Sequence, residues 1–520
     1  MQRKEKNAAK TISMVMVVTL IGKVLGLYRD RLLAVHYSVG MEANAFFTAS
    51  RIPRVFFDAV FASAIAACFI PVFSEYLEKK GKREAFRFAG EFITVITLLT
   101  AGLTGLGMLF PQPLVALFAD YADPQTTELA VSLTRVMFPT VLFSGVAFSL
   151  VGVLQAQEHF TAPALMSTAS NLVIIGYFLF LDKQGGIYGL AAAYLVGWLI
   201  QGLIQIPPLR RLEFPYRPAV SLRSEGMKKV FALMGPVMVS TWVQPINLVI
   251  NSRFGSRLYD GGGVSALEYS TNLYLVIAGT FILSITNVIF PRLSRLTAGE
   301  KLGEFQSTLR FTLHASLFFV LPMMAGLMLL SRPLISFVYG GGEFDALSVQ
   351  ITSTALTWVS LGMVGYAVQN ILSRAYFARQ DGRIPLAAGA VSIGVNIALC
   401  AVLIAPLGIA GLALSSAVSS GTYALLLLLP MLRKQEGRLD LRFWYDVIKM
   451  LLSTLLMAAA VWAVEGILSG LLPAGKVGEV VLLGACAALG VAVYFIAANL
   501  LSLEEAVLVR RFASRFRKRG

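Results

Sequence analysis

Charged side chains interrupt two long apolar stretches near the N-terminus. The first stretch carries Lys23, Arg29 and Asp30, and the second carries Arg51, Arg54 and Asp58. A charge inside a membrane span costs about 2.5–3.5 kcal/mol on insertion scales, so each of these residues suggests a function. Arginine suits phosphate oxygens in particular, because its planar guanidinium donates two hydrogen bonds together. The cluster therefore predicts a cationic site for an anionic head group.

The spacing of these charges places them on shared helix faces. Lys23 and Asp30 are seven residues apart, and Arg51, Arg54 and Asp58 follow one another at three and four. A stripe of this kind cannot face lipid, so we expect it to line a cavity or to pair with the first helix. An alternative stays open, in which Arg29 pairs with Asp30 and Arg54 with Asp58 only to neutralise charge.

Amide side chains in later apolar stretches form a second candidate site. Gln244, Asn247 and Asn251 follow one another at three and four, and Asn396 lies in a further stretch. Their oxygens could line an ion or polar cavity. Interhelical hydrogen bonding is the commoner use of such residues in membranes, so both interpretations stay open.

Other kinds of site lack the residues that they need. Cys68, Cys400 and Cys486 lie singly in apolar stretches, and the chain has only three histidines, so neither a metal site nor a disulfide framework is predicted. No glycine-rich loop is followed by Lys and Ser or Thr, as a nucleotide site would require. We therefore expect no enzyme activity and no cofactor, with energy supplied by the membrane potential or by a monovalent cation gradient.

The composition identifies the elements that must position these residues. Apolar residues make up 57% of the 520-residue chain and charged residues 14%, and the mean hydropathy is +0.72. A soluble domain carries about 25% charged residues. The net charge of +15 is spread over short loops, which excludes a nucleic-acid-binding domain. The chain is predicted to be an all-α polytopic membrane protein, because lipid offers unpaired backbone groups no partner.

Fourteen segments are long and apolar enough to cross a hydrocarbon core about 30 Å thick. Most Lys and Arg residues lie in the tails and loops on one side, which predicts that both termini are cytoplasmic. An even number of spans agrees with that orientation. The segments cover residues 9–36, 43–76, 84–110, 127–156, 160–182, 186–211, 225–253, 263–294, 304–331, 347–378, 383–405, 408–432, 442–469 and 476–502.

Short sequence matches recur at a nearly constant separation. Gly186 and Gly408 each begin a Gly-Ile-x-Gly-Leu-Ala motif, and Pro71 and Pro291 occupy matching positions, so the separations are 222 and 220 residues. This pattern predicts two six-helix lobes, helices 1–6 and 7–12, that face a central cavity and alternate between inward- and outward-open states, with helices 13 and 14 added. The predicted domains are residues 1–212, 213–434 and 435–520.

Four N-terminal motifs carry a family resemblance. They are Lys23-Val24-Leu25-Gly26-Leu27-Tyr28-Arg29-Asp30, Ala43-Asn44-Ala45-Phe46-Phe47, Arg51-Ile52-Pro53 and Phe69-Ile70-Pro71-Val72-Phe73-Ser74-Glu75-Tyr76. They resemble the start of the MurJ (MviN) family in the multidrug/oligosaccharidyl-lipid/polysaccharide exporter superfamily. The resemblance implies a flippase that moves the undecaprenyl-pyrophosphate-linked peptidoglycan precursor, lipid II, from the inner to the outer leaflet of the bacterial plasma membrane. Cell-wall synthesis enzymes are the implied protein partners.

The resemblance also assigns roles to individual residues. Arg29 and Asp30 match the span-1 pair of the family and carry over as head-group and gating residues, whereas Lys23 stands where the family has an arginine. Asn44 and Asn272 occupy the positions of a family Asp and a family Arg, and we expect both to contribute to substrate binding. These departures keep two other functions open: a flippase for a different polyprenyl-linked oligosaccharide, and a non-transporting scaffold for cell-wall enzymes.

Overall fold

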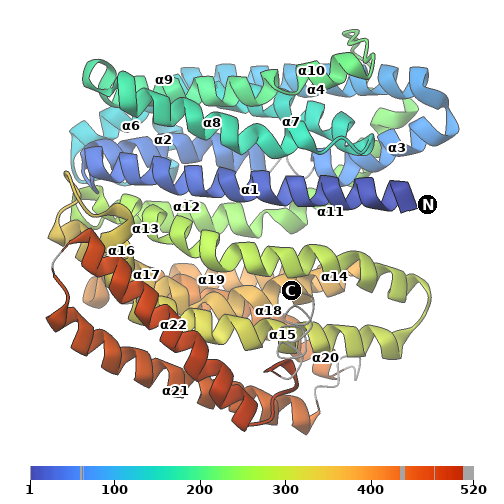
Figure 1. Ribbon diagram of the computed structural model, residues 1–520. Helices are drawn as coiled ribbons and strands as arrows, with labels where there is room; N and C mark the ends of the chain where they lie inside the picture. Colours follow the sequence, from blue (N-terminus) through green and yellow to red (C-terminus); the bar gives the residue numbers. More distant parts are fainter. Residues whose placement is uncertain (1, 59–60, 62–63, 434–439, 474, 507–520) are drawn as a thin grey trace. The chain divides into compact units, whose positions relative to one another are not determined.

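Helices account for nearly all of the described chain. The computed structural model describes residues 2–58, 61, 64–433, 440–473 and 475–506 (Figure 1). Side chains are described throughout these ranges except at residues 2–13, 64, 66–67, 235–241, 244, 287 and 433. Within them the only β-structure is an isolated bridge between Gly341 and Phe344. The predicted all-α class is therefore confirmed.

Ten helices in the described ranges are long and apolar enough to cross a membrane. An eleventh span arises if the bent pair Ala346–Leu361 and Met363–Ala378 counts as one. Each coincides with one of the predicted segments. The other three predicted segments, 9–36, 43–76 and 225–253, are helical over their described residues except for a turn at Trp242. The count of fourteen therefore stays a prediction, with which these helices are compatible.

The first compact unit, Met1–Ser265, is called the N-terminal unit here. A short π-helix, η2 (Ala64–Phe69), and a 3-10 helix, η3 (Tyr259–Gly261), interrupt its α-helices. The α-helices are α1 (Gln2–Tyr37), α2 (Met41–Phe57), α3 (Ile70–Lys79), α4 (Gly81–Leu109), α5 (Pro111–Phe118), α6 (Pro124–Met137), α7 (Thr140–Ala156), α8 (Thr161–Phe180), α9 (Asp182–Leu203), α10 (Ile206–Arg211), α11 (Glu225–Thr241) and α12 (Val243–Gly255).

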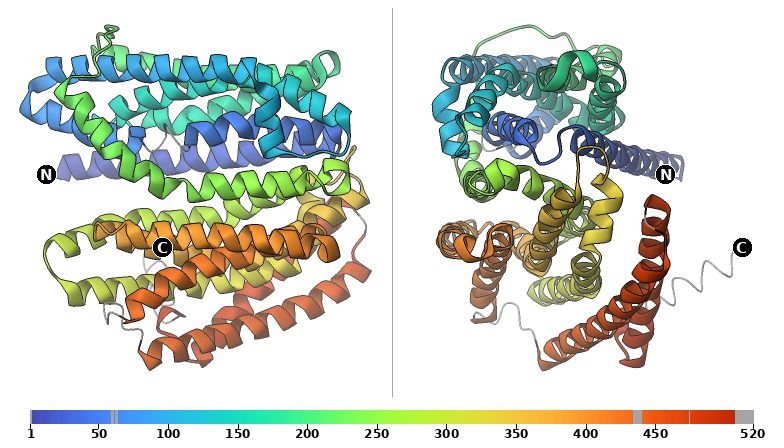
Figure 2. Two further views of the ribbon diagram at one scale, coloured as in Figure 1. Left: turned by 180° about the vertical axis from the view of Figure 1, so that it is seen from behind. Right: turned by 90° about the vertical axis from the view of Figure 1, so that its left-hand side faces the viewer.

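The second compact unit, Ala266–Gly520, is called the C-terminal unit. Within it α19 lies beside α20, and α21 lies beside α22, as the views of Figure 2 show. Its helices are α13 (Gly262–Tyr274, which begins in the N-terminal unit), the π-helix η4 (Leu275–Gly279), α14 (Thr280–Ala298), α15 (Leu302–Leu329), α16 (Ser331–Tyr339), α17 (Ala346–Leu361), α18 (Met363–Ala378), α19 (Arg383–Leu407), α20 (Ile409–Arg433), α21 (Leu441–Leu471) and α22 (Lys476–Leu500).

The boundary between the compact units differs from the boundary predicted between the lobes. The units meet at residues 265 and 266, whereas the repeat placed the first lobe boundary at residues 212 and 213. Helices α11 and α12 therefore belong to the N-terminal unit by their packing. The lobes were defined by sequence repetition, which this division does not test, so the domains 1–212, 213–434 and 435–520 stay a prediction.

Small residues let α1 and α8 pack closely within the N-terminal unit (Figure 1). A Cβ atom built on Gly22 would lie 3.1 Å from the hydroxyl oxygen of Thr168, and one on Gly26 would lie 3.4 Å from the Asn171 side-chain nitrogen. Close approach of this kind is the usual basis of helix association in lipid. It brings the polar groups of α8 within hydrogen-bond reach of α1.

A buried histidine joins three parts of the C-terminal unit. His314 on α15 hydrogen-bonds through Nδ1 to Glu505, which follows α22, and its Nε2 lies 3.8 Å from Asp446 on α21. The three side chains are only 8–15% exposed. Burial raises the pKa of Glu505, but its bonds to His314 and to its own backbone amide outweigh burial and leave the pKa below its usual range.

We expect His314→Ala to destabilise the protein, because Glu505 would stay buried without this partner. The loss should be about 2 kcal/mol, the cost typical of a buried polar group that loses its hydrogen bond. Because the folded-state pKa of Glu505 is lowered, its contribution is present at pH 7 and is lost as pH falls through that lowered value. Thermal unfolding of the purified protein at pH 7 measures the effect.

Arg442→Ala is the matched control for this measurement. It breaks an ion pair with Glu504 in which both side chains are more than 70% exposed. Exposed pairs contribute at most about 1 kcal/mol and often much less. An equal fall in unfolding temperature for the two variants would contradict the role given to His314.

Candidate functional site

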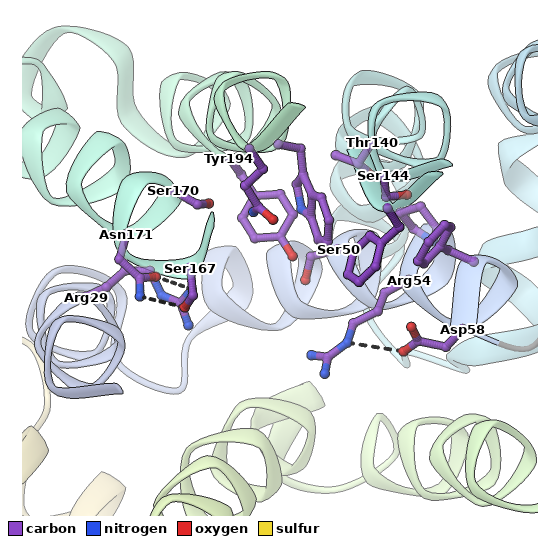
Figure 3. Close-up of a pocket in the computed structure, with 15 residues that line it drawn as sticks. Arg29, Ser50, Arg54, Asp58, Thr140, Ser144, Ser167, Ser170, Asn171 and Tyr194 are labelled. Carbon is purple, nitrogen blue, oxygen red and sulfur yellow. Dashed lines mark hydrogen bonds and ion pairs between the residues drawn. The ribbon is translucent and has the colours of Figure 1, made fainter. Parts of the chain in front are cut away.

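A polar cavity of about 300 Å³ lies among five helices of the N-terminal unit (Figure 3). We call it the N-terminal pocket. Arg29 of α1 supplies one charged group, and Arg54 and Asp58, at the end of α2, supply two more. Three of the predicted site residues therefore meet here. Neutral residues complete the lining: Ser50, Pro53 and Phe57 of α2, Thr140, Ser144 and Phe148 of α7, Ser167, Ser170 and Asn171 of α8, and Tyr194, Trp198 and Gln201 of α9.

Arg29 is held in place from two sides. Its Nε and one terminal nitrogen donate to Asp30 Oδ1 at 3.0 and 2.6 Å, and its other terminal nitrogen donates to Asn171 Oδ1 at 3.0 Å. Asn171 Nδ2 in turn donates to the Gly22 carbonyl at 2.9 Å, so one amide joins α1 and α8 beside the guanidinium. The Arg29 side chain is 27% exposed and that of Asp30 only 6%. The cavity therefore presents the cation, while the carboxylate lies behind it.

Arg54 and Asp58 form a looser pair one helical turn apart. The Arg54 Nε atom lies 3.5 Å from Asp58 Oδ2, and the two side chains are 59% and 48% exposed (Figure 3). An exposed pair of this geometry contributes little stability. The structure thus contains both ion pairs of the alternative in which Arg29 pairs with Asp30 and Arg54 with Asp58. Both arginines also line the cavity, where their guanidinium groups can meet a ligand.

The stripe predicted on α2 divides between two environments. Arg54 and Asp58 line the N-terminal pocket, whereas Arg51 is only 5% exposed and is absent from the lining. Each residue advances about 100° around a helix, so Arg51 lies about 60° from Arg54, enough to turn it into the packed interior. Spacing alone could not separate these two positions.

Asn44 lies outside the pocket and joins α2 to the start of α13 within the N-terminal unit. Its side-chain nitrogen donates to the Val39 carbonyl at 2.9 Å. Its side-chain oxygen accepts the Ser265 backbone N–H at 3.1 Å and also the Ser265 hydroxyl. The Tyr121 hydroxyl donates to the Asn44 backbone carbonyl at 2.9 Å. The amide is buried and makes these bonds within the protein, so the structure gives Asn44 an architectural place rather than a position on the cavity wall.

The remaining predicted residues lie elsewhere in the two units. Lys23 is half-buried on α1 and is not part of the lining. Asn247 and Asn251 are half-buried on α12, and Gln244 lies outside the residues whose side chains are described. In the C-terminal unit, Asn272 is half-buried on α13, and buried Asn396 accepts a weak hydrogen bond from Cys400 Sγ at 3.7 Å. Neither unit contains the whole amide set, so its role as an ion or polar cavity stays a prediction.

Sequence reasoning missed the neutral lining on α8 and α9. On α8 the sequence separations are three residues from Ser167 to Ser170 and one from Ser170 to Asn171. On α9 they are four residues from Tyr194 to Trp198 and three from Trp198 to Gln201. Each set shares one helix face. The same periodicity argument that found the charged residues would have found both sets if it had been applied to uncharged ones. Among the described residues, no group of three or more His, Cys, Asp or Glu side chains is placed to hold a metal ion.

Comparison with known proteins gives one consistent result. The family model described as "Lipid II flippase MurJ" matches residues 34–483. The lipid II flippase MurJ of Burkholderia cenocepacia is 28% identical over 490 residues, which cover 92% of this chain and 94% of that protein. The probable lipid II flippase MurJ of Haemophilus influenzae is 29% identical over 464 residues, covering 86% and 90%.

Solved structures agree with the sequence matches. A lipid II flippase MurJ in an inward closed conformation matches with a TM-score of 0.78 and 26% identity over 94% of this chain and 98% of that chain. An inward-facing MATE family transporter of the MOP superfamily matches with a TM-score of 0.69 and 14% identity over 82% and 98%, which shows a shared fold. With the family model covering most of its length and apolar helices to cross the bilayer, this chain belongs to the lipid II flippase MurJ family, a family of inner-membrane transporters rather than enzymes.

Proposed function

We propose that this chain moves lipid II from the inner to the outer leaflet by alternating access, and that the N-terminal pocket binds the pyrophosphate of the head group. The observation that carries the second part is that Arg29 and Arg54 line one polar cavity in a membrane-spanning unit. Two guanidinium groups can donate paired hydrogen bonds to adjacent phosphates. Family membership supplies the cargo.

The carboxylates beside the two arginines suit a transporter, which must release what it binds. In the unloaded pocket Asp30 holds Arg29 and Asp58 holds Arg54. Pyrophosphate would replace part of these contacts, so the arginines are never left without an anionic partner. Because one ionic contact is exchanged for another, the net free energy of loading stays small, and the cargo can be released again.

The size of the pocket limits what it holds. Ligand cavities usually measure about 300–1,000 Å³, and this one is at the lower end of that range. It would therefore accept the pyrophosphate and the adjoining sugar, while the rest of the head group lies outside it. The polyprenyl tail would stay in the bilayer, where lipid chains already surround its apolar surface.

The membrane potential favours the proposed direction of transport. Basic loops and tails support cytoplasmic termini in the plasma membrane, so the unloaded pocket would receive its anionic cargo from the negative side. Moving one negative charge from the negative to the positive side of the membrane lowers the free energy by about 2.3 kcal/mol per 100 mV of membrane potential. Coupling to the potential or to a monovalent cation would thus drive export. Cell-wall synthesis enzymes are the proposed protein partners, because they make and consume this cargo.

Complementation tests the proposed function directly. The full chain would be expressed in a bacterium depleted of its own lipid II flippase, with membrane levels checked by immunoblot. We expect growth and cell shape to be restored. Failure to rescue at matched membrane levels would contradict lipid II as the cargo and would favour a different polyprenyl-linked oligosaccharide.

Asn171→Leu should weaken binding of lipid II about threefold. Leucine has a similar volume but accepts no hydrogen bond, so Arg29 would lose one of its two anchors. A hydrogen bond of this kind contributes about 0.5–1.5 kcal/mol. Titration of the purified protein with lipid II measures the change. Asn499→Leu, at an exposed position on α22, is the matched control, and equal affinities for the two variants would contradict the anchoring role of Asn171.

A further inference from the structure

Helix α9 presents two aromatic rings to the N-terminal pocket. Tyr194 and Trp198 are one helical turn apart, and Gln201 follows on the same face. Both rings are half-buried, and Figure 3 shows Tyr194 reaching into the cavity toward Ser50. A pocket that bound only pyrophosphate would need no flat apolar surface. The two rings are therefore available to contact another part of the ligand.

Neighbouring aromatic residues fix the orientation of both rings. Phe46 meets Tyr194 edge-on, with ring centroids 5.8 Å apart and planes at 88°. Phe148 lies 6.4 Å from Trp198 with an interplanar angle of 37°. Contacts of this geometry hold a side chain without covering it completely. Little rotational freedom is therefore lost when a ligand packs against either ring.

The hydroxyl groups opposite α9 are arranged as acceptors. Ser50 donates its hydroxyl hydrogen to the Phe47 carbonyl at 3.1 Å, and Thr140 and Ser144 donate theirs to carbonyls of their own chain segment at 2.7 and 3.0 Å. Each oxygen keeps lone pairs that can accept a hydrogen bond. These groups suit a ligand that brings its own O–H and N–H donors.

We propose that Tyr194 and Trp198 form a saccharide subsite that binds the sugar attached to the pyrophosphate. A pyranose ring has an apolar C–H face and a rim of hydroxyl donors, which match an aromatic surface and hydroxyl acceptors respectively. The two arginines would hold the phosphates, and α9 would select a glycosylated lipid over the bare carrier. The inference rests on the proposed function, because it takes the pyrophosphate position from it.

Two lipid probes separate the saccharide contact from the phosphate contact. The purified full-length protein would be titrated with lipid II and with undecaprenyl pyrophosphate, which shares the phosphates and tail but has no sugar. We expect Trp198→Ala to weaken lipid II binding about fivefold and to leave undecaprenyl pyrophosphate within about twofold, a loss typical of one aromatic contact. Trp198→Phe, which keeps a ring and the packing, should recover most of the lipid II affinity.

Two further variants complete the test. Trp462→Ala removes a 68% exposed indole on α21 and should change neither affinity. Arg29→Ala should weaken both probes, so a failure of that result would overturn the phosphate assignment and not the saccharide subsite. Equal losses for both probes in Trp198→Ala, or no loss for either, would overturn the saccharide subsite. Recovery in Trp198→Phe excludes misfolding as the cause.

Discussion

Arg29→Ala is expected to abolish rescue of a bacterium that depends on this chain for lipid II transport. The guanidinium faces the N-terminal pocket and is oriented by Asp30 and Asn171. Loss of charge-assisted hydrogen bonds to pyrophosphate should cost about 3 kcal/mol, which is roughly a hundredfold in affinity. Growth after depletion and titration with lipid II measure the two consequences.

A second variant separates this loss from a defect in folding. The Asp30 side chain is only 6% exposed, and Arg29→Ala removes the arginine that bonds to it. Loss of such a partner can destabilise a protein by up to about 3–5 kcal/mol. Arg29→Ala combined with Asp30→Asn avoids the buried negative charge and should restore the membrane level without restoring transport. Rescue by that double variant would contradict the binding role, because Arg29 would then serve only to neutralise Asp30.

The helical architecture could be predicted because a lipid environment allows few alternatives. Long apolar segments must satisfy their backbone groups internally, so hydropathy alone locates most helices. Interruptions within a span are harder to predict from hydropathy. Segment 43–76 is divided among α2, η2 and α3, and segment 225–253 is divided between α11 and α12.

The charged half of the pocket was predicted from the sequence, whereas its neutral half was missed. Arg29, Arg54 and Asp58 stand out because charges are costly in a span. Asn171 and Trp198 do not, because amides and aromatic residues are ordinary in membrane helices. Their importance follows from tertiary contacts such as the close packing of α1 on α8. Asn44 shows the same limit, since its partner Ser265 is 221 residues away in the sequence.

Arg54→Ala and Asp58→Asn should change the affinity for lipid II in opposite directions. Arg54 donates to the cargo in the proposed complex, and Asp58 competes with the cargo for the same guanidinium at 3.5 Å. Loss of the arginine should weaken binding about tenfold, and loss of the competing carboxylate should tighten it by up to about tenfold, the range typical of charge-assisted contacts. Titration with lipid II measures both, and Arg210→Ala, an exposed arginine of α10, is the control.

Tighter binding in Asp58→Asn should not speed transport. A carrier gains nothing from an interaction that holds its cargo equally in every state, because release then limits the cycle. We therefore expect Asp58→Asn to bind lipid II more tightly and yet to rescue growth less well than the unaltered chain. Tighter binding with improved rescue would contradict a competing role for Asp58. An unchanged affinity would show that the Arg54–Asp58 pair does not open to admit the pyrophosphate.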